Sequence, residues 1–139
     1  MADPISILGA FAASSQLIDQ GFKITKFILQ IYSDIQNAPV LVSTRFRQIE
    51  QLIGVSKLIQ QMPVLQSREV ADVLSTCYDK ATIVLFKLKQ LLSGAEDRRW
   101  QKLKNSLATI MQKKDLGGLF DDLEREKSTL ILCLQTVQP

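Results

Sequence analysis

The strongest constraint on the fold is a regular spacing of apolar residues between Ser67 and Ser93. Steps of four and three residues alternate along this stretch, which is the repeat by which one face of an α-helix packs against its neighbours in a bundle. The positions on the repeat are Val70, Leu74, Cys77, Ala81, Val84, Leu88 and Leu91. They predict a helix with a buried seam, and Gly94 is well placed to end it.

Two more helices are predicted ahead of this one. Asp3 and Pro4 indicate the start of the first, because Asp can cap free backbone N–H groups and Pro is preset for the first helical position. This helix is apolar on nearly all sides, with a bend or break expected near Gly21, and ends before Pro39. The second helix runs from Pro39 up to Pro63, which stops it. We expect its apolar side to hold Val42, Phe46, Ile49, Leu52, Ile53, Leu58 and Ile59, and its outer face to hold Arg45, Arg47, Glu50 and Lys57.

Two further helices are predicted after Gly94. Asp97 opens a fourth helix, whose apolar positions are Trp100, Leu103, Leu107 and Ile110. Lys113-Lys114-Asp115 and the pair Gly117-Gly118 are expected to end it. The last helix again uses steps of four and three residues, at Leu116, Phe120, Leu123, Lys127, Leu130, Leu134 and Val137. No segment shows the sustained alternation typical of a strand. With 139 residues, the chain is expected to form one domain over residues 1–139, an all-α bundle of four to five helices with mostly antiparallel neighbours.

The composition removes most enzymatic chemistry. The chain has no histidine, which excludes Ser-His-Asp and Cys-His catalysis and histidine zinc sites. Its two cysteines, Cys77 and Cys133, lie far apart without a CxxC partner, and the glycine pair at 117–118 lacks the Lys-Ser/Thr of a phosphate-binding loop. A group of carboxylates near the start of the last helix is interpreted as a solvated face: Asp121, Asp122, Glu124 and Glu126. We therefore expect no catalysis, no cofactor and no metal.

The N-terminus and the cysteines predict a cytoplasmic protein. An acid, Asp3, stands where a secretory signal would carry Lys or Arg. Asp19 and Lys23 interrupt the apolar run that follows, short of the roughly 20 residues that a transmembrane helix needs. Both cysteines are expected to be reduced and buried.

The most basic stretch runs from Asp97 to Lys114, with six basic residues against one acid. It includes Arg98, Arg99, Lys102 and Lys104. Such a helix can lie against the acidic last helix without any ligand, rest on anionic lipid headgroups, or attract RNA. The modest net charge of +3 and the lack of interleaved aromatic residues argue against a nucleic-acid partner.

The first helix also carries a row of mostly small residues, with Gly9, Ala13, Leu17 and Gly21 spaced four apart. Small residues let helices approach closely, so this row fits self-association. Two interpretations remain open. The segment is either the central helix of the bundle, or a segment sequestered in one state and inserted into a membrane in another.

Four blocks of the chain resemble a known family. They are Met1-Ala2-Asp3-Pro4-Ile5-Ser6, Asp34-Ile35-Gln36-Asn37-Ala38-Pro39, Arg99-Trp100-Gln101-Lys102-Leu103-Lys104 and Leu123-Glu124-Arg125-Glu126-Lys127-Ser128-Thr129-Leu130. In these blocks, which follow one another across nearly the whole chain, the sequence resembles the N-terminal helical domains of fungal NLR-like STAND receptors, the SesA and HeLo-like group. Each block is a helical motif without catalytic residues.

The resemblance implies a cell-death effector. Such a domain is held inactive in a receptor, oligomerises on activation, and relocates to the plasma membrane, which its N-terminal segment targets or permeabilises. The residues that would carry insertion and self-association here are Ile5, Leu8, Gly9, Phe11, Ala13, Leu17 and Gly21. The implied partners are anionic membrane lipids, other copies of the chain, and an upstream receptor or amyloid-signalling partner. The alternative function is a non-catalytic helical adaptor for protein–protein signalling in such a receptor.

Overall fold

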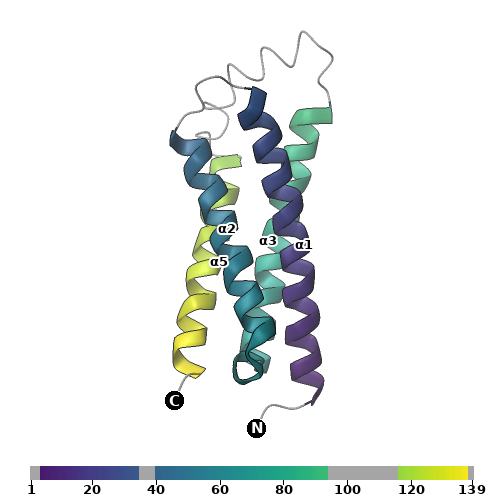
Figure 1. Cartoon of the computed structure of the whole chain (residues 1–139), viewed down its shortest axis with the longest axis vertical. Helices are drawn as coiled ribbons and strands as arrows, with labels where there is room; N and C mark the ends of the chain where they lie inside the picture. Colours follow the sequence, from purple (N-terminus) through teal and green to yellow (C-terminus); the bar gives the residue numbers. More distant parts are fainter. Residues whose placement is uncertain (1–3, 35–39, 94–115, 138–139) are drawn as a thin grey trace.

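The described residues of the computed structural model form four long helices and one short 3-10 turn (Figure 1). They are residues 4–34, 40–93 and 116–137, with side chains described for 9–29, 43–90 and 116–136. The elements are α1 (Pro4–Asp34), α2 (Val40–Gln61), η1 (Pro63–Leu65), α3 (Arg68–Ser93) and α5 (Leu116–Val137). The predicted all-α bundle is confirmed, whereas the predicted fourth helix, with Arg98, Arg99, Lys102 and Lys104, lies outside the described residues.

Local chemistry accounts for the turn between α2 and α3. Pro63 cannot continue α2, and the chain makes the single turn η1, whose Leu65 is fully buried. The side-chain amide of Gln66 then donates hydrogen bonds to the carbonyls of Ile59 and Gln60, at 3.0 and 3.2 Å, and so satisfies two acceptors at the end of α2. Ser67 caps α3 as its side chain accepts a hydrogen bond from the backbone N–H of residue 70.

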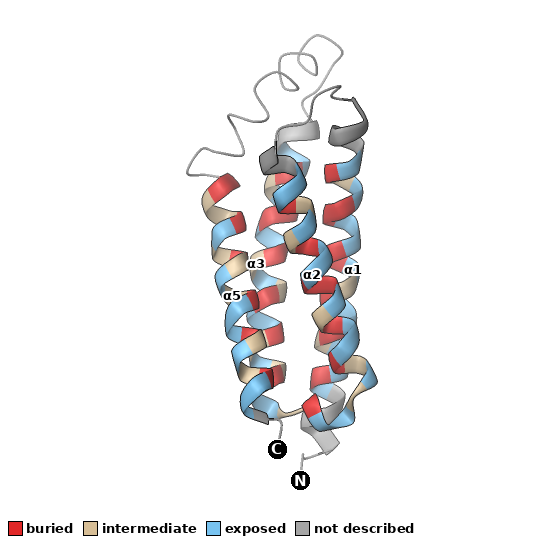
Figure 2. Ribbon diagram, turned by 60° about the vertical axis from the view of Figure 1, so that its left-hand side comes forward, coloured by how far each residue is buried: buried red, intermediate tan, exposed pale blue. Residues whose placement is uncertain are grey.

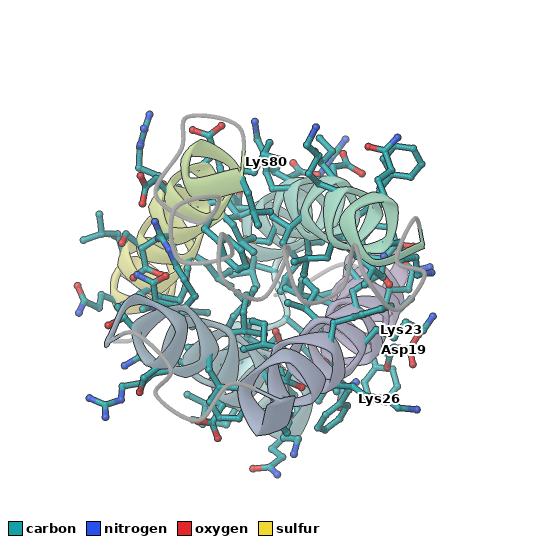
Figure 3. All side chains as sticks on the ribbon, turned by 90° about the horizontal axis from the view of Figure 1, so that it is seen from above. Asp19, Lys23, Lys26 and Lys80 are labelled. Carbon is teal, nitrogen blue, oxygen red and sulfur yellow. The ribbon has the colours of Figure 1, made fainter. Side chains whose placement is uncertain are left out.

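The four helices occupy the corners of a square when seen from above, in the order α2, α1, α3, α5 (Figure 3). α1 runs antiparallel to α2, as expected for neighbours joined by a short connection, and α3 runs antiparallel to α5 (Figure 1). α1 and α3 are also neighbours, but they run in the same direction. The reason is that η1 leads the chain from α2 to the opposite corner of the bundle, and α3 therefore packs on α1 rather than on α2.

The core lies along the axis between the helices, where each helix presents its buried side (Figure 2). The predicted seam of α3 is confirmed at every position whose side chain is described: Val70, Leu74, Cys77, Ala81, Val84 and Leu88 are all buried. The predicted repeat of α5 is buried as well, at Leu116, Phe120, Leu123, Lys127, Leu130 and Leu134. On α2 the expected core residues Ile49, Leu52, Ile53 and Ile59 are buried, but Leu58 is 43% exposed.

Candidate functional site

The predicted N-terminal segment lies in α1, which packs on both α2 and α3. Ile5 and Leu8 belong to this helix, but their side chains are not among those described. Among the remaining candidates, Gly9 is exposed, Phe11 is 49% exposed, Ala13 is half-buried, and Leu17 and Gly21 are buried. The predicted row therefore winds from the surface into the core instead of forming one face. Each step of four residues turns about 40° beyond a full helical turn, so the row drifts around the helix.

Gly21 lies at a close contact between α1 and α2. A Cβ atom built there would lie 2.5 Å from Cγ1 of Ile53 and 3.0 Å from its Cδ1, both on α2. A glycine at this position lets the two helices pack closely, and α1 runs through it as one helix without the expected break. Gly9 has open space around the same position, so it does not take part in close packing within the described residues.

α1 also carries an exposed line of apolar side chains, which lies to one side of its buried face. Phe11, Phe22 and Leu29 are 49%, 51% and 51% exposed, and Ile18 between them is half-buried. Steps of seven, four and seven residues separate these four side chains. Around the helix, each of the other three lies within about 20° of the direction of Phe11, so the four follow one line. We call this line, Phe11, Ile18, Phe22 and Leu29, the α1 stripe. Its spacing was readable in the sequence, but a helix that is apolar on nearly all sides does not reveal which side faces the core.

Positive charges lie beside the α1 stripe. The ammonium group of Lys57 on α2 lies 5.2 Å from the centre of the Phe22 ring, within the range of a cation–π contact. Lys23 and Lys26 project outward from α1, and Lys23 pairs with Asp19 at 3.0 Å (Figure 3). In the part of the chain that the structure describes, no helix combines the length and the hydropathy that crossing a membrane requires.

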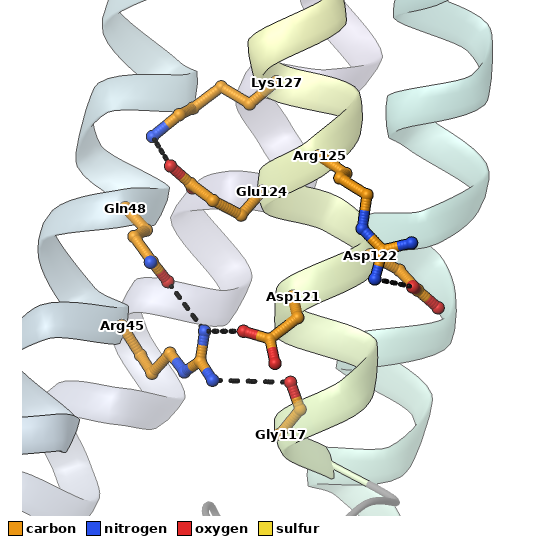
Figure 4. Close-up of polar contacts among 8 residues, drawn as sticks. All are labelled: Arg45, Gln48, Gly117, Asp121, Asp122, Glu124, Arg125 and Lys127. Carbon is orange, nitrogen blue, oxygen red and sulfur yellow. Dashed lines mark hydrogen bonds and ion pairs between the residues drawn. The ribbon is translucent and has the colours of Figure 1, made fainter.

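A second group of polar residues joins α2 to α5. The guanidinium of Arg45 donates hydrogen bonds to a carboxylate oxygen of Asp121 at 2.8 Å, to the amide oxygen of Gln48 at 3.1 Å, and to the carbonyl of Gly117 at 3.4 Å (Figure 4). It also lies 5.4 Å from the centre of the Phe120 ring. The Arg45 side chain is only 8% exposed, whereas that of Asp121 is 60% exposed.

Lys127 of α5 forms the second half of this group. Its side chain is 5% exposed and donates to Glu124 at 2.7 Å (Figure 4). It also donates, across to α2, to the amide oxygen of Gln51 at 2.7 Å. The neighbouring pair Asp122 and Arg125 points to the other side of α5 and is largely solvated. Two of the four carboxylates expected on a solvated face, Asp121 and Glu124, thus hold buried cations.

The placement of Arg45 on the outer face of α2 was wrong. Arg45 is buried because it extends the spacing of Ile49, Leu52, Ser56 and Ile59, which are buried at alternate steps of three and four residues. That spacing was visible in the sequence, but a charged residue at its first position argued against it. A buried charge needs a partner, and Asp121, on another helix, could not be identified by spacing alone.

Neither cysteine is in a disulfide bond, and Cys77 is fully buried on α3. Burial raises the pKa of the Cys77 thiol from its ordinary 9.0 to about 12, with the charge of Glu126 acting in the same direction. Burial also raises the pKa of the half-buried Cys133 thiol. High pKa values make both thiols poor nucleophiles near neutral pH.

Comparisons of the chain with protein-family models, with curated proteins and with solved structures give no match.

Proposed function

We propose that this chain is a non-catalytic effector domain of cell-death signalling that engages anionic membranes through α1 and self-associates there. The resemblance to SesA and HeLo-like domains suggests this function, and one structural observation supports it. α1 carries apolar side chains on two sides, an inner side packed in the bundle and the exposed α1 stripe.

The α1 stripe and its lysines have the composition of a face that binds a membrane interface. Helices that lie in the interface place Phe and Leu toward the acyl chains and Lys toward the headgroups. Phe11, Phe22 and Leu29 supply the apolar side chains, and Lys23 and Lys26 supply the charges. In the first step of the proposal, the folded bundle binds the cytoplasmic surface of an anionic membrane through the α1 stripe.

Insertion of residues 5–22 forms the second step of the proposal. The inner side chains of this segment, such as Ala10 and Leu17, must leave the core, and apolar surface elsewhere must replace the contacts that they lose. A membrane and neighbouring copies of the chain both offer such surface. Gly9, with open space around it, and Ala13 are placed for close contact between copies of the helix.

The basic stretch is proposed as an additional contact to anionic lipid. Replacing Arg98, Lys102 and Lys104 together by Gln is expected to weaken binding, because each basic residue near an anionic surface contributes about 1 kcal/mol. Binding equal to that of the wild type would remove this stretch from the proposal.

Vesicle binding and dye release by the full chain test the proposed function. We expect the protein to float with vesicles of phosphatidylserine and phosphatidylcholine and to release their dye, to do neither with pure phosphatidylcholine, and to bind less in high salt. An adaptor that recruits a protein through the α1 stripe predicts neither binding nor release at any lipid composition. That result would overturn the membrane proposal.

A further inference from the structure

We infer that the bundle opens along the line between α2 and α5, the α2–α5 seam, with α5 swinging away from α2 while it stays packed on α3. In this inference the ion pair of Arg45 with Asp121 and the hydrogen bond from Lys127 to Gln51 form a latch that holds the seam closed. The inference concerns the folded chain itself and does not depend on the proposed function.

The first argument is how the helices pack. α1 packs closely on α2 and α3, and α3 packs closely on α5, whereas α2 and α5 approach each other less. An open groove of about 560 Å³ lies between α2 and α5, lined in part by Gly54, Val55, Leu58 and Ile131. A Cβ atom at Gly54 would meet nothing within 4 Å. Apolar packing therefore holds this seam less firmly than the other three.

The second argument is the chemistry of the contacts that close the seam. Arg45 reaches from α2 to Asp121, and Lys127 reaches from α5 to Gln51, so both cross the seam with buried cations. Burying a cation carries a desolvation cost that its ion pair offsets only in part. Nε of Arg45 has no hydrogen-bond partner among the described residues, which adds to that cost. Both cations become hydrated when the seam opens. Opening here therefore costs less free energy than separating an apolar interface.

Cys77 is a built-in probe of this opening. Its thiol is fully buried in the core, on the inner face of α3, and lies near Glu126 of α5. Ile49 and Leu52 of α2 face Phe120 and Leu123 of α5 next to the latch, and their separation gives a reagent a way into the core. A Cys133→Ser background leaves Cys77 as the only thiol.

Native-state labelling of Cys77 by a small thiol reagent, followed over a range of urea, tests the inference. Opening at the seam predicts labelling at low urea that is faster than global unfolding allows and nearly independent of urea, because little surface is exposed. Asp121→Asn with Glu124→Gln removes the carboxylate charges that pair with the two buried cations and is expected to raise this rate at least tenfold. The matched control, Asp122→Asn, breaks an exposed pair on the same helix and should leave the rate unchanged.

A locked variant tests the opposite direction. Arg45→Met with Lys127→Met makes the latch apolar and leaves the partly exposed carboxylates to water, so the rate at low urea should fall at least tenfold. Circular dichroism reports whether this variant folds. If it does not fold, the labelling rate of the Asp121→Asn/Glu124→Gln variant tests the inference alone. Labelling that follows global unfolding in the wild type and in both variants would overturn the inference. Vesicle assays do not enter this test, so a failed membrane proposal leaves it intact.

Discussion

Two glycines in neighbouring helices show how strongly single positions differ in this bundle. Gly21 of α1 is buried against Ile53 of α2, with no room for a methyl group, whereas Gly54 of α2 faces open space beside the α2–α5 seam. Both interrupt good helical sequence at about the same intrinsic cost. Only the packing around them tells the two apart.

Replacing each glycine by alanine should therefore change stability in opposite directions. Gly21→Ala is expected to lower the free energy of unfolding by about 1–3 kcal/mol, because overpacking outweighs the gain in helix propensity. Gly54→Ala, its matched control, is expected to raise that free energy by about 0.5–1 kcal/mol. Urea unfolding followed by circular dichroism measures both, and a stabilised Gly21→Ala protein would contradict the close contact with Ile53.

The Cys77 thiol predicts a dependence of stability on pH. Its pKa is raised from 9.0 to about 12 in the folded chain, so its contribution to stability is complete below about pH 9 and is lost as the pH rises toward 12. Above pH 9, the free energy of unfolding of the wild type should fall more steeply than that of Cys77→Ala, by up to about 1.4 kcal/mol per pH unit. Parallel curves for the two proteins between pH 8.5 and 10.5 would show that Cys77 is not held in an apolar site.

At the scale of the helices, the sequence predicts best where one face is apolar and the other polar. α3 has this contrast, and its buried positions and its start next to Ser67 agree with the prediction. α1 lacks the contrast, so the sequence did not distinguish the core side with Leu17 from the outer side with Phe22. On α2, the partner that makes a buried Arg45 acceptable lies on another helix and is visible only in three dimensions.

Helix direction was the other part that the sequence left open. Short connections predict antiparallel neighbours, but they do not say which corner of the bundle the next helix takes. The turn η1 carries the chain across the end of the bundle, and the parallel contact of α1 with α3 follows from that path.

Truncation on the two sides of α3 tests the assignment of its faces. Leu74→Ala and Leu88→Ala remove side chains that are fully buried, and each is expected to lower the free energy of unfolding by about 2–5 kcal/mol. Ile83→Ala is the matched control, because Ile83 is 46% exposed on the outer face, and its cost should stay within about 0.5 kcal/mol. Equal losses of unfolding free energy in Leu88→Ala and Ile83→Ala would contradict the assignment of the buried face of α3.

At the scale of the whole molecule, the helix proposed to meet the membrane is also the one that joins two sides of the bundle. α1 packs on α2 and α3, so its inner side contributes to stability while the α1 stripe remains available on the surface. The inferred opening of the α2–α5 seam lies away from these contacts. The bundle can thus present the α1 stripe while closed, and a change at the seam can precede any release of α1.

Dye release from phosphatidylserine-containing vesicles by two serine double variants tests the central claim most directly. Phe11→Ser with Phe22→Ser alters the α1 stripe, and Ile83→Ser with Phe86→Ser alters side chains on α3 that are similarly exposed, at 46% and 61%. Both should fold like the wild type, because none of the four side chains is buried. We predict that the α1 variant loses at least nine-tenths of the dye release while the α3 variant retains it. Undiminished release by the α1 variant, or an equal loss in both, would contradict the claim that α1 is the membrane-engaging face.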